Sequence, residues 1–223
     1  MALKKDIITS AIGILTLTLL CGILYPLVIT GIGQVTFPGN ANGQKVYIGH
    51  TLIGSKIIGQ NFADPVVNAK TGKVELDKNG NPVTVPDPRY FQTRPSGTTP
   101  SDNAAATTFA NYGPNSKVTE QAIASNIQAY IALNGRYYPG GLTAAKVPVD
   151  AADTSASGID PDISVANADI QAHRIAAVDH LSLATVDRLV SGNTAGRGLG
   201  FSGEPSVDVL EVNLAIHRLI GGR

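Results

Sequence analysis

The chain has 223 residues, with 17 basic and 17 acidic side chains and one cysteine. The balanced charge removes the electrostatic basis for binding nucleic acid or an anionic membrane surface. A lone cysteine excludes a disulfide within the chain, and the length outside one long apolar segment suits one globular domain or two small subdomains.

The apolar segment Ile7–Ile32 contains 26 residues and no charged side chain. At a rise of about 1.5 Å per residue it can cross a hydrocarbon core of roughly 30 Å, so it predicts a transmembrane helix. A cleavable signal peptide would need a small-residue site close to the segment, and a lipoprotein signal would need a small residue before Cys21, where Leu20 stands. A buried core helix is rarely this long without a charge.

Basic residues before the span predict its orientation. Lys4 and Lys5 precede the span, whereas the first basic residue after it is Lys45. Positively charged flanks stay in the cytoplasm. We therefore expect a single-pass protein of the cell (inner) membrane with a cytoplasmic N-terminus (1–6), a membrane helix (7–32) and an extracytoplasmic domain (33–223).

Small residues on the span indicate helix contacts. Gly13 lies on one face with Thr9 and Thr16, and Gly22 lies nearly opposite, which predicts neighbouring helices on two sides or, equally, a helix that faces lipid. Pro26, which follows Tyr25, is expected to kink or end the helix near the outer interface.

Short strands separated by turns are expected after the span. A turn is predicted at 39–43, and short apolar runs at 46–48, 52–53 and 57–58 predict strands broken by glycine. Residues 74–76 and 83–85 flank Asn79-Gly80 and predict a β-hairpin. Residues 93–114 have no periodicity and predict a loop.

Helices dominate the second half of the predicted domain. Asn115 or Ser116 can cap a helix that ends near Asn134-Gly135, and residues 137–148 form a connector from which Val147 and Val149 could enter a strand. Ser164 and Ser182 can each cap a further amphipathic helix, the first ending near Asp179. After a glycine-rich loop at 192–203, residues 207–220 fit either a strand followed by a short helix or one helix.

Catalytic and nucleotide-binding patterns are incomplete in this sequence. Gly54–Gly59 has the spacing of a phosphate-binding loop, but Gln60-Asn61 replaces the required lysine and hydroxyl residue. Lys70-Thr71-Gly72 and Ser101-Asp102-Asn103 match two of the three penicillin-recognising motifs, but in reversed order and without an S-x-x-K nucleophile. We therefore assign no catalytic residue, and the sequence identifies no nucleotide-binding residue.

Metal and cation sites have only weak candidates. Asp169, His173 and His180 would share one helix face if the helix continued through His180, and otherwise they form a solvated surface, so no metal ligand is assigned. Five aspartates between residues 150 and 169 could gather cations, or they could simply line a solvated loop and the N-termini of helices.

Ordered blocks along nearly the whole chain match the pattern of one known family. They are Tyr25-Pro26-Leu27, Gly54-Ser55 with Ile58–Phe62, Tyr90-Phe91 with Arg94-Pro95-Ser96, Thr154–Asp160, Gln171, Arg174, Gly203-Glu204-Pro205 and Val209–Ala215. In this order they resemble the KdpC family, the C subunits of bacterial potassium-transporting Kdp P-type ATPases. Two segments depart from the pattern: Thr107–Asn111 replaces S-G-G-S-N, and Asn68–Val85 resembles an added hairpin.

The resemblance implies an α+β protein with one N-terminal transmembrane helix followed by a single mixed α/β extracytoplasmic domain. Residues expected to support the fold or contact other subunits are Gly13, Gly22, Tyr25, Pro26, Gly54, Ser55, Gly59, Gln60, Phe62, Tyr90, Phe91, Arg94, Ser96, Ser155, Ser157, Gly158, Asp160, Gln171, Arg174 and Asn213.

The same resemblance implies a non-catalytic accessory subunit of a high-affinity, ATP-driven potassium uptake complex. Its implied partners are a potassium-channel-like subunit, a P-type ATPase catalytic subunit that binds ATP and magnesium, and a further small membrane subunit. The family is also described as a catalytic chaperone that raises the ATP affinity of the catalytic subunit, which conflicts with a domain outside the cytoplasm. The alternatives are a membrane-anchored external hydrolase with a spatial triad and an anchored ligand-binding module.

Overall fold

The computed structural model describes residues 2–98, 100–106, 112–113 and 115–221. Its internal contacts divide the chain into two compact units, Met1–Ile53 and Gly54–Arg223, which we call unit 1 and unit 2. The Thr107–Asn111 segment, where the sequence departs from the family pattern, lies outside the described residues.

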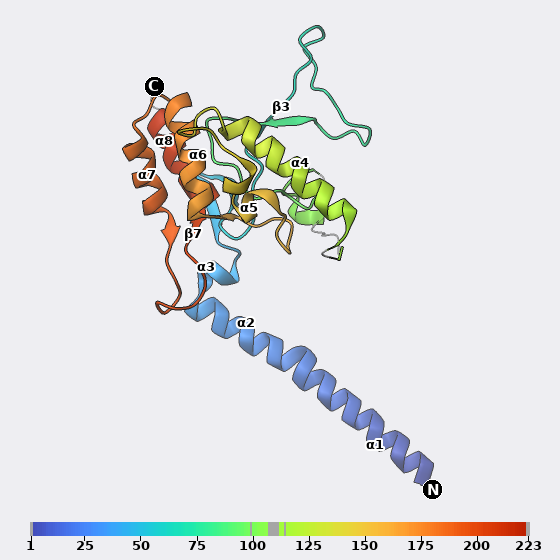
Figure 1. Cartoon of the computed structure of the whole chain (residues 1–223). Helices are drawn as coiled ribbons and strands as arrows, with labels where there is room; N and C mark the ends of the chain where they lie inside the picture. The colour runs from blue at the N-terminus through green and yellow to red at the C-terminus, as the bar shows by residue number, and fades with distance from the viewer. Residues whose placement is uncertain (1, 99, 107–111, 114, 222–223) are drawn as a thin grey trace. The chain divides into compact units, whose positions relative to one another are not determined.

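Unit 1 begins with one continuous helix that confirms the predicted span (Figure 1). It consists of α1 (Ala2–Leu17), the π-helical segment η1 (Thr18–Leu24) and α2 (Tyr25–Thr36). Residues Leu3–Thr36 are long and apolar enough to cross a membrane, and none of the most apolar window is buried within the structure. The helix therefore has the length and composition of a membrane anchor.

The sequence leaves two outcomes open at Pro26, a kink or the end of the helix, and the second is wrong because the helix continues to Thr36. Proline lacks an amide N–H and its ring clashes with the carbonyl four residues earlier in an α-helix. Here the Tyr25 N–H instead donates to the Leu20 carbonyl, five residues back, in a π-type turn. This wider turn directly before Pro26 lets a second α-helical segment start with proline at its N-terminal end.

The end of unit 1 is a short helix and a hairpin. The predicted turn at 39–43 includes a one-turn helix, α3 (Pro38–Ala41). The expected strands form as β1 (Lys45–Ile48) and β2 (Thr51–Ser55), and they pair with each other. Gly49 has φ +59° in the turn between them, a conformation that glycine adopts without steric cost. Ile57 lies in a turn and Ile58 forms only an isolated bridge with Ser55, so the strand predicted at 57–58 does not form.

Unit 2 opens with an excursion that projects from its body (Figure 1). The predicted hairpin is confirmed near its tip, where the amides of Asn79 and Asn81 donate to the Asp77 carboxylate and Val83 N–H donates to Glu75 O. The second strand of the predicted hairpin, however, corresponds to β4 (Thr84–Pro86). It pairs antiparallel with β3 (Ala63–Pro65) and not with residues 74–76. The excursion therefore leaves the body and returns to it through this two-stranded ladder.

Helix predictions in unit 2 are mostly confirmed. The longest helix, α4 (Lys117–Asn134), has the expected bounds. The prediction of a strand near Val149 is wrong, because the chain forms the 3₁₀ turn η3 (Ala144–Lys146) and then α5 (Val149–Ala152). Pro148 has the extended conformation of an N-cap, and Asp150 places a negative charge in the first turn of the helix, where the helix dipole favours it.

Three helices and a small sheet form the body of unit 2. The helices are α6 (Val165–Val178), α7 (Leu183–Gly192) and α8 (Val209–Ile220). The strands β5 (Asp162–Ser164), β7 (Ser206–Asp208) and β6 (Thr194–Ala195) lie in that order, and both pairs are antiparallel. Ser164, Ser182 and Asp208 cap the helices with side-chain hydrogen bonds, and 207–220 is therefore a strand that leads into a helix.

The hydrophobic core lies among these helices and the sheet. Its buried members in the described part of the chain are Phe91, Ile163, Ala168, Ala172, Ile175, Ala176, Val186, Val190, Val207, Val209, Val212 and Ile216. Phe91 is fully buried although it lies outside regular secondary structure. The loop that contains Phe91 must therefore be held against α6 and α8.

Candidate functional site

A buried polar network holds this loop in place, and Arg174 of α6 lies at its centre. The side chain is fully buried. Its guanidinium donates to the backbone carbonyls of Pro88 (3.0 Å) and Tyr90 (2.6 Å), to Asn134 Oδ1 (2.8 Å) and to Gln171 Oε1 (3.1 Å). Burial lowers the pKa of Arg174 to about 10, so the cation remains charged at neutral pH and is balanced by oxygen dipoles.

Amide side chains complete the network on both sides of Phe91. Asn213 of α8 accepts from Phe91 N–H (2.8 Å) and donates to Phe91 O (2.9 Å). Gln171 of α6 makes the same pair of bonds with Gln92 N–H and Gln92 O. Two helices thus bind consecutive residues of one loop as if they were the neighbouring strand of a sheet.

Helix α4 joins the network through its C-terminal turns. Tyr130 donates through its hydroxyl to Asn167 Oδ1 (2.8 Å), and Asn134 donates to Tyr130 O while it accepts from Arg174. Burial is the main cause that raises the pKa of Tyr130, so its hydroxyl stays neutral and keeps its proton. The network thus connects α4, α6, α8 and the loop that contains Tyr90 and Phe91, which we call the Tyr90 loop.

A second cluster joins three loops, which carry Arg94, the Thr154–Asp160 block and Gly59. We call it the loop clamp. The Arg94 guanidinium contacts Asp160 Oδ2 (3.2 Å) and the Thr154 carbonyl (3.2 Å). Ser96 donates to Gly158 O (2.9 Å), and Gly158 has φ +74°, which favours glycine. The serine-rich block is fixed locally, because the Ser155 and Ser157 hydroxyls lie 3.1 Å apart.

The third loop of the clamp carries Gly59. Its N–H donates to Ile159 O (2.7 Å). A β-carbon at this position would lie 2.8 Å from Asp160 O and 2.9 Å from Asp102 Oδ1, closer than real β-carbon contacts. Burial raises the pKa of the Asp102 carboxyl to about 6, although a hydrogen bond from Thr93 acts in the opposite direction.

An aromatic and ionic group forms the rim beside the Tyr90 loop. The Tyr90 hydroxyl lies 2.8 Å from His217 Nδ1, and its ring packs against Phe62 with centroids 6.0 Å apart. Burial acts to raise the pKa of Asp87, but hydrogen bonds and the charge of Arg89 outweigh it and lower the pKa overall. Asp87 and Arg89 therefore form an ion pair at 2.6 Å.

Gly54 lies close to the ends of two flexible side chains. A β-carbon on Gly54 would lie 2.7 Å from Gln60 Oε1 and 2.9 Å from Leu210 Cδ2. Ser55 follows it at the end of β2, and Lys56 pairs with Glu211 of α8 at 2.9 Å. The Gly54–Gln60 block thus packs against α8.

The aspartates between residues 150 and 169 are largely used inside the fold. Asp150 accepts from Ser164 N–H, Ser164 Oγ and Asn167 Nδ2, all within 2.9 Å. Asp160 pairs with Arg94, and Asp162 accepts from Ser206 (2.9 Å). These bonds favour the interpretation that the stretch caps and joins local elements over the interpretation that it gathers cations.

The helical arrangement that would align the metal-ligand candidates is absent. Helix α6 ends at Val178, and His180 lies beyond it with φ +56°. His173 packs edge-on against the Tyr138 ring at 5.3 Å. Within the described ranges, no group of three His, Cys, Asp or Glu side chains is placed to hold a metal ion.

A groove of about 450 Å³ lies between α4 and the Asp153–Ala156 loop. Ile123 and Val118 contribute apolar side chains to one wall. On the other wall, Asp153 Oδ1 accepts from Thr154 N–H, and Asn126 reaches across from α4 to donate to Ala152 O. Asp153 and Asn126 therefore already make hydrogen bonds inside unit 2.

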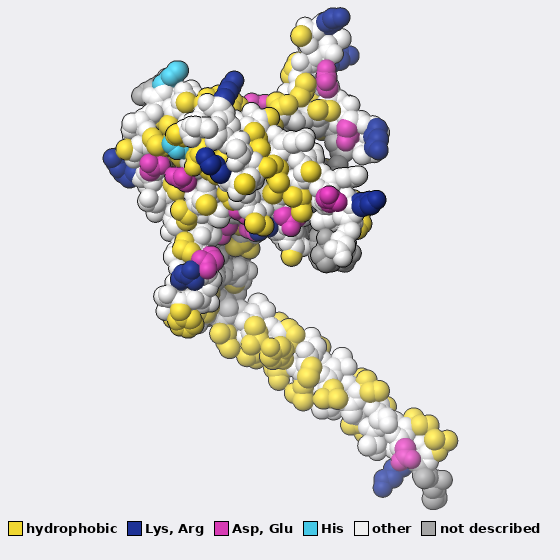
Figure 2. Space-filling model, viewed as in Figure 1, with side chains coloured by type: hydrophobic (Ala, Val, Ile, Leu, Met, Phe, Trp, Pro, Cys, Tyr) yellow, Lys and Arg dark blue, Asp and Glu magenta, His cyan; other side chains and the backbone are white. Residues whose placement is uncertain are grey.

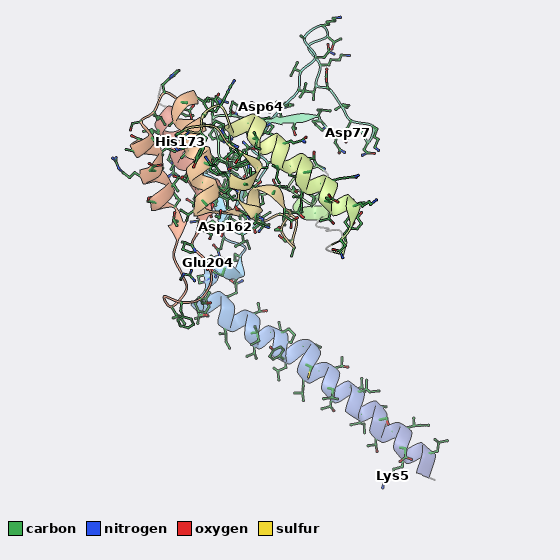
Figure 3. All side chains as sticks on the ribbon, in the orientation of Figure 1. Lys5, Asp64, Asp77, Asp162, His173 and Glu204 are labelled. Carbon is green, nitrogen blue, oxygen red and sulfur yellow. The ribbon has the colours of Figure 1, made fainter. Side chains whose placement is uncertain are left out.

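Most of the site residues that the sequence indicated lie in unit 2. They make contacts with one another inside the domain. Figure 3 shows how densely side chains fill the body of unit 2. Gly13, Gly22, Tyr25 and Pro26 belong to the exposed helix of unit 1, and their role in subunit contact remains a prediction. The residues that sequence reasoning missed are Gln92, Asp102, Tyr130, Asn134 and Asn167.

Comparison with known proteins places this arrangement in a family. A family model described as K+-transporting ATPase, c chain, matches residues 7–218. The chain belongs to the KdpC family. The match begins in the membrane helix and ends in α8, so both units are parts of the family pattern.

Curated KdpC proteins cover nearly the whole chain. The potassium-transporting ATPase KdpC subunit of Methylococcus capsulatus is 40% identical over 207 residues, which are 92% of this chain and 94% of that protein. The subunit of Mycobacterium bovis is 36% identical over 97% of this chain and 100% of its own length. The subunit of Streptomyces avermitilis is 35% identical over 93% of this chain and 90% of its own length.

Proposed function

We propose that this chain is a non-catalytic accessory subunit of an ATP-driven potassium uptake complex and is needed for its assembly and stability. The observation that carries the proposal is the family match over residues 7–218 together with a membrane helix at Leu3–Thr36. The partners are a potassium-channel-like subunit, a P-type ATPase catalytic subunit and a further small membrane subunit.

The polar side chains of unit 2 support a structural role over a catalytic one. Arg174, Gln171 and Asn213 bond to the Tyr90 loop, and Arg94 bonds to the Thr154–Asp160 loop. Groups engaged in this way stabilise the fold instead of meeting a substrate. In this proposal, ATP and magnesium belong to the catalytic subunit, and any effect on ATP affinity reaches that subunit through the membrane helix.

Deletion of this subunit is expected to abolish potassium uptake at low external potassium and to reduce co-purification of the channel-like subunit with the ATPase subunit. Expression of the full chain should restore both, whereas unit 1 alone, residues 1–53, should not restore the full yield. Intact uptake in the deletion strain would contradict the proposal. Labelling of the chain by a serine-reactive probe would instead support the external hydrolase.

We also propose that unit 2 lies outside the cytoplasm, because Lys4 and Lys5 precede the span and Lys45 is the first basic residue after it. In a Cys21→Ser background, Asn79→Cys at the exposed excursion should react with an impermeant maleimide in intact cells. The matched variant Lys5→Cys should react only after the cells are opened. The reverse pattern would show the opposite topology.

A further inference from the structure

The loop between β6 and β7 presents two bulky apolar side chains to solvent. Leu199 is 91% exposed and Phe201 is 75% exposed. In Figure 1 this loop extends from the helical body of unit 2. Figure 2 shows hydrophobic, charged and polar side chains interspersed over the viewed surface of unit 2. Among the large hydrophobic side chains of the described residues, Leu199 is the most exposed.

Hydrogen bonds within the loop fix how these side chains are presented. Gly198 and Ser202 exchange N–H···O bonds of 2.7 and 2.8 Å, which close a tight turn around Leu199 and Phe201. At the base of the turn, Arg197 donates to Gly203 O (2.9 Å) and pairs with Glu204 (2.6 Å). Because the turn is already ordered, binding through it loses little further conformational entropy. We call Gly198–Ser202 the apolar tip.

Leu199 occupies a backbone conformation that residues with a β-carbon rarely adopt. Its φ is +53°, and the adjacent Gly200 has φ +82°. Glycine would suit the first position better on steric grounds. Strain of this kind indicates a role for the side chain beyond the stability of the loop.

The chain itself supplies a surface for these side chains, because it is anchored in a bilayer. The membrane helix ends at Thr36 and unit 2 begins at Gly54. The 17 residues between them reach at most about 60 Å when fully extended, and α3, β1 and β2 shorten that reach. The bilayer surface is therefore always at a high effective concentration near unit 2.

Two side chains are too little for a protein interface but sufficient to add to an existing anchor. A stable protein interface buries on the order of 1,000 Å² or more, whereas a tethered domain has already met most of the entropic cost of association. We propose that the apolar tip inserts Leu199 and Phe201 into the headgroup and acyl boundary of the bilayer. This second membrane contact goes beyond the proposed function.

The charges at the base of the apolar tip cancel, so the proposed contact is hydrophobic in character. Arg197 is paired with Glu204, so the base of the tip carries no net charge. Insertion should therefore be similar in bilayers of phosphatidylcholine alone and in bilayers that also contain phosphatidylglycerol. An electrostatic contact would instead strengthen with anionic lipid and weaken with salt.

The test uses the full chain in phosphatidylcholine nanodiscs, with Cys21→Ser and a nitroxide label on Leu199→Cys. We expect the label to collide with oxygen, which concentrates in the bilayer, and to be protected from a water-soluble nickel chelate. The matched label on Val149→Cys, a position that is 78% exposed in α5, should show the opposite pattern. Adding Phe201→Ser should shift the ratio of inserted to free tip by roughly 30-fold towards free.

Two outcomes would overturn the proposal. One is equal access of the nickel chelate to the labels at positions 199 and 149. The other is protection of Leu199→Cys only after the channel-like and ATPase subunits are added, which would assign the tip to a protein surface. Neither outcome depends on whether the chain is needed for potassium uptake.

Discussion

Replacing Arg174 with methionine is expected to lower the free energy of unfolding of unit 2 by about 3 kcal/mol or more. The guanidinium is fully buried and donates to Pro88 O, Tyr90 O and Asn134 Oδ1. Methionine fills a similar volume but leaves these oxygens without that donor in a region that water does not reach. An apolar replacement is tolerated only where the polar partners are removed as well.

Thermal and urea unfolding of the full chain in detergent, followed by circular dichroism, would measure this loss. Arg188→Met on the exposed side of α7 is the matched control and should remain within about 0.5 kcal/mol of the parent chain. Arg174→Lys should fall between the two, because an ammonium keeps the charge but lacks the planar fork that spans several acceptors. A stability of Arg174→Met equal to that of the control would show that the network is not required.

Gly59→Ala should destabilise the loop clamp by about 2 kcal/mol. The added β-carbon would lie 2.8 Å from Asp160 O and 3.1 Å from Ile159 O, and these are backbone atoms that cannot rotate away. Relief requires the loops to separate, which lengthens the bond from Gly59 N–H to Ile159 O. The Arg94–Asp160 ion pair at the same junction should weaken as well.

Protease sensitivity of residues 54–62 and of the Thr154–Asp160 loop, together with the unfolding midpoint, would detect this change. Gly113→Ala is the control, because no atom of the described residues lies within 4 Å of a β-carbon at that position. Parent-like stability of Gly59→Ala would show that the loops have room to adjust and that the clamp is not tightly packed.

Local signals in the sequence predicted local structure well. Ser164 and Ser182 are followed by amphipathic patterns, and both cap helices in the structure. The uncharged run Ile7–Ile32 likewise predicted the membrane helix, although not its extension beyond Ile32 to Thr36. Each of these features depends on residues within a few turns of one another.

Pairings between distant residues could not be predicted in this way. Strands β3 and β4 have three residues each and lie about 20 residues apart, so no periodic pattern indicates that Ala63 pairs with Pro86. In the same way, Asn134 resembled a helix stop in the sequence, whereas its side chain in fact binds Arg174, 40 positions later. Partners of buried polar groups are set by tertiary packing, which a single sequence does not reveal.

The placement of the core also has a consequence for biogenesis. Among the described residues, all buried core members except Phe91 lie between Ile163 and Ile216. The membrane helix leaves the ribosome first, and residues 54–162 then follow for roughly 5 to 20 s at ordinary synthesis rates before the core segment appears. During this interval that part of unit 2 lacks the helices that it packs against, so the domain should acquire its protease resistance only after synthesis of the chain is nearly finished.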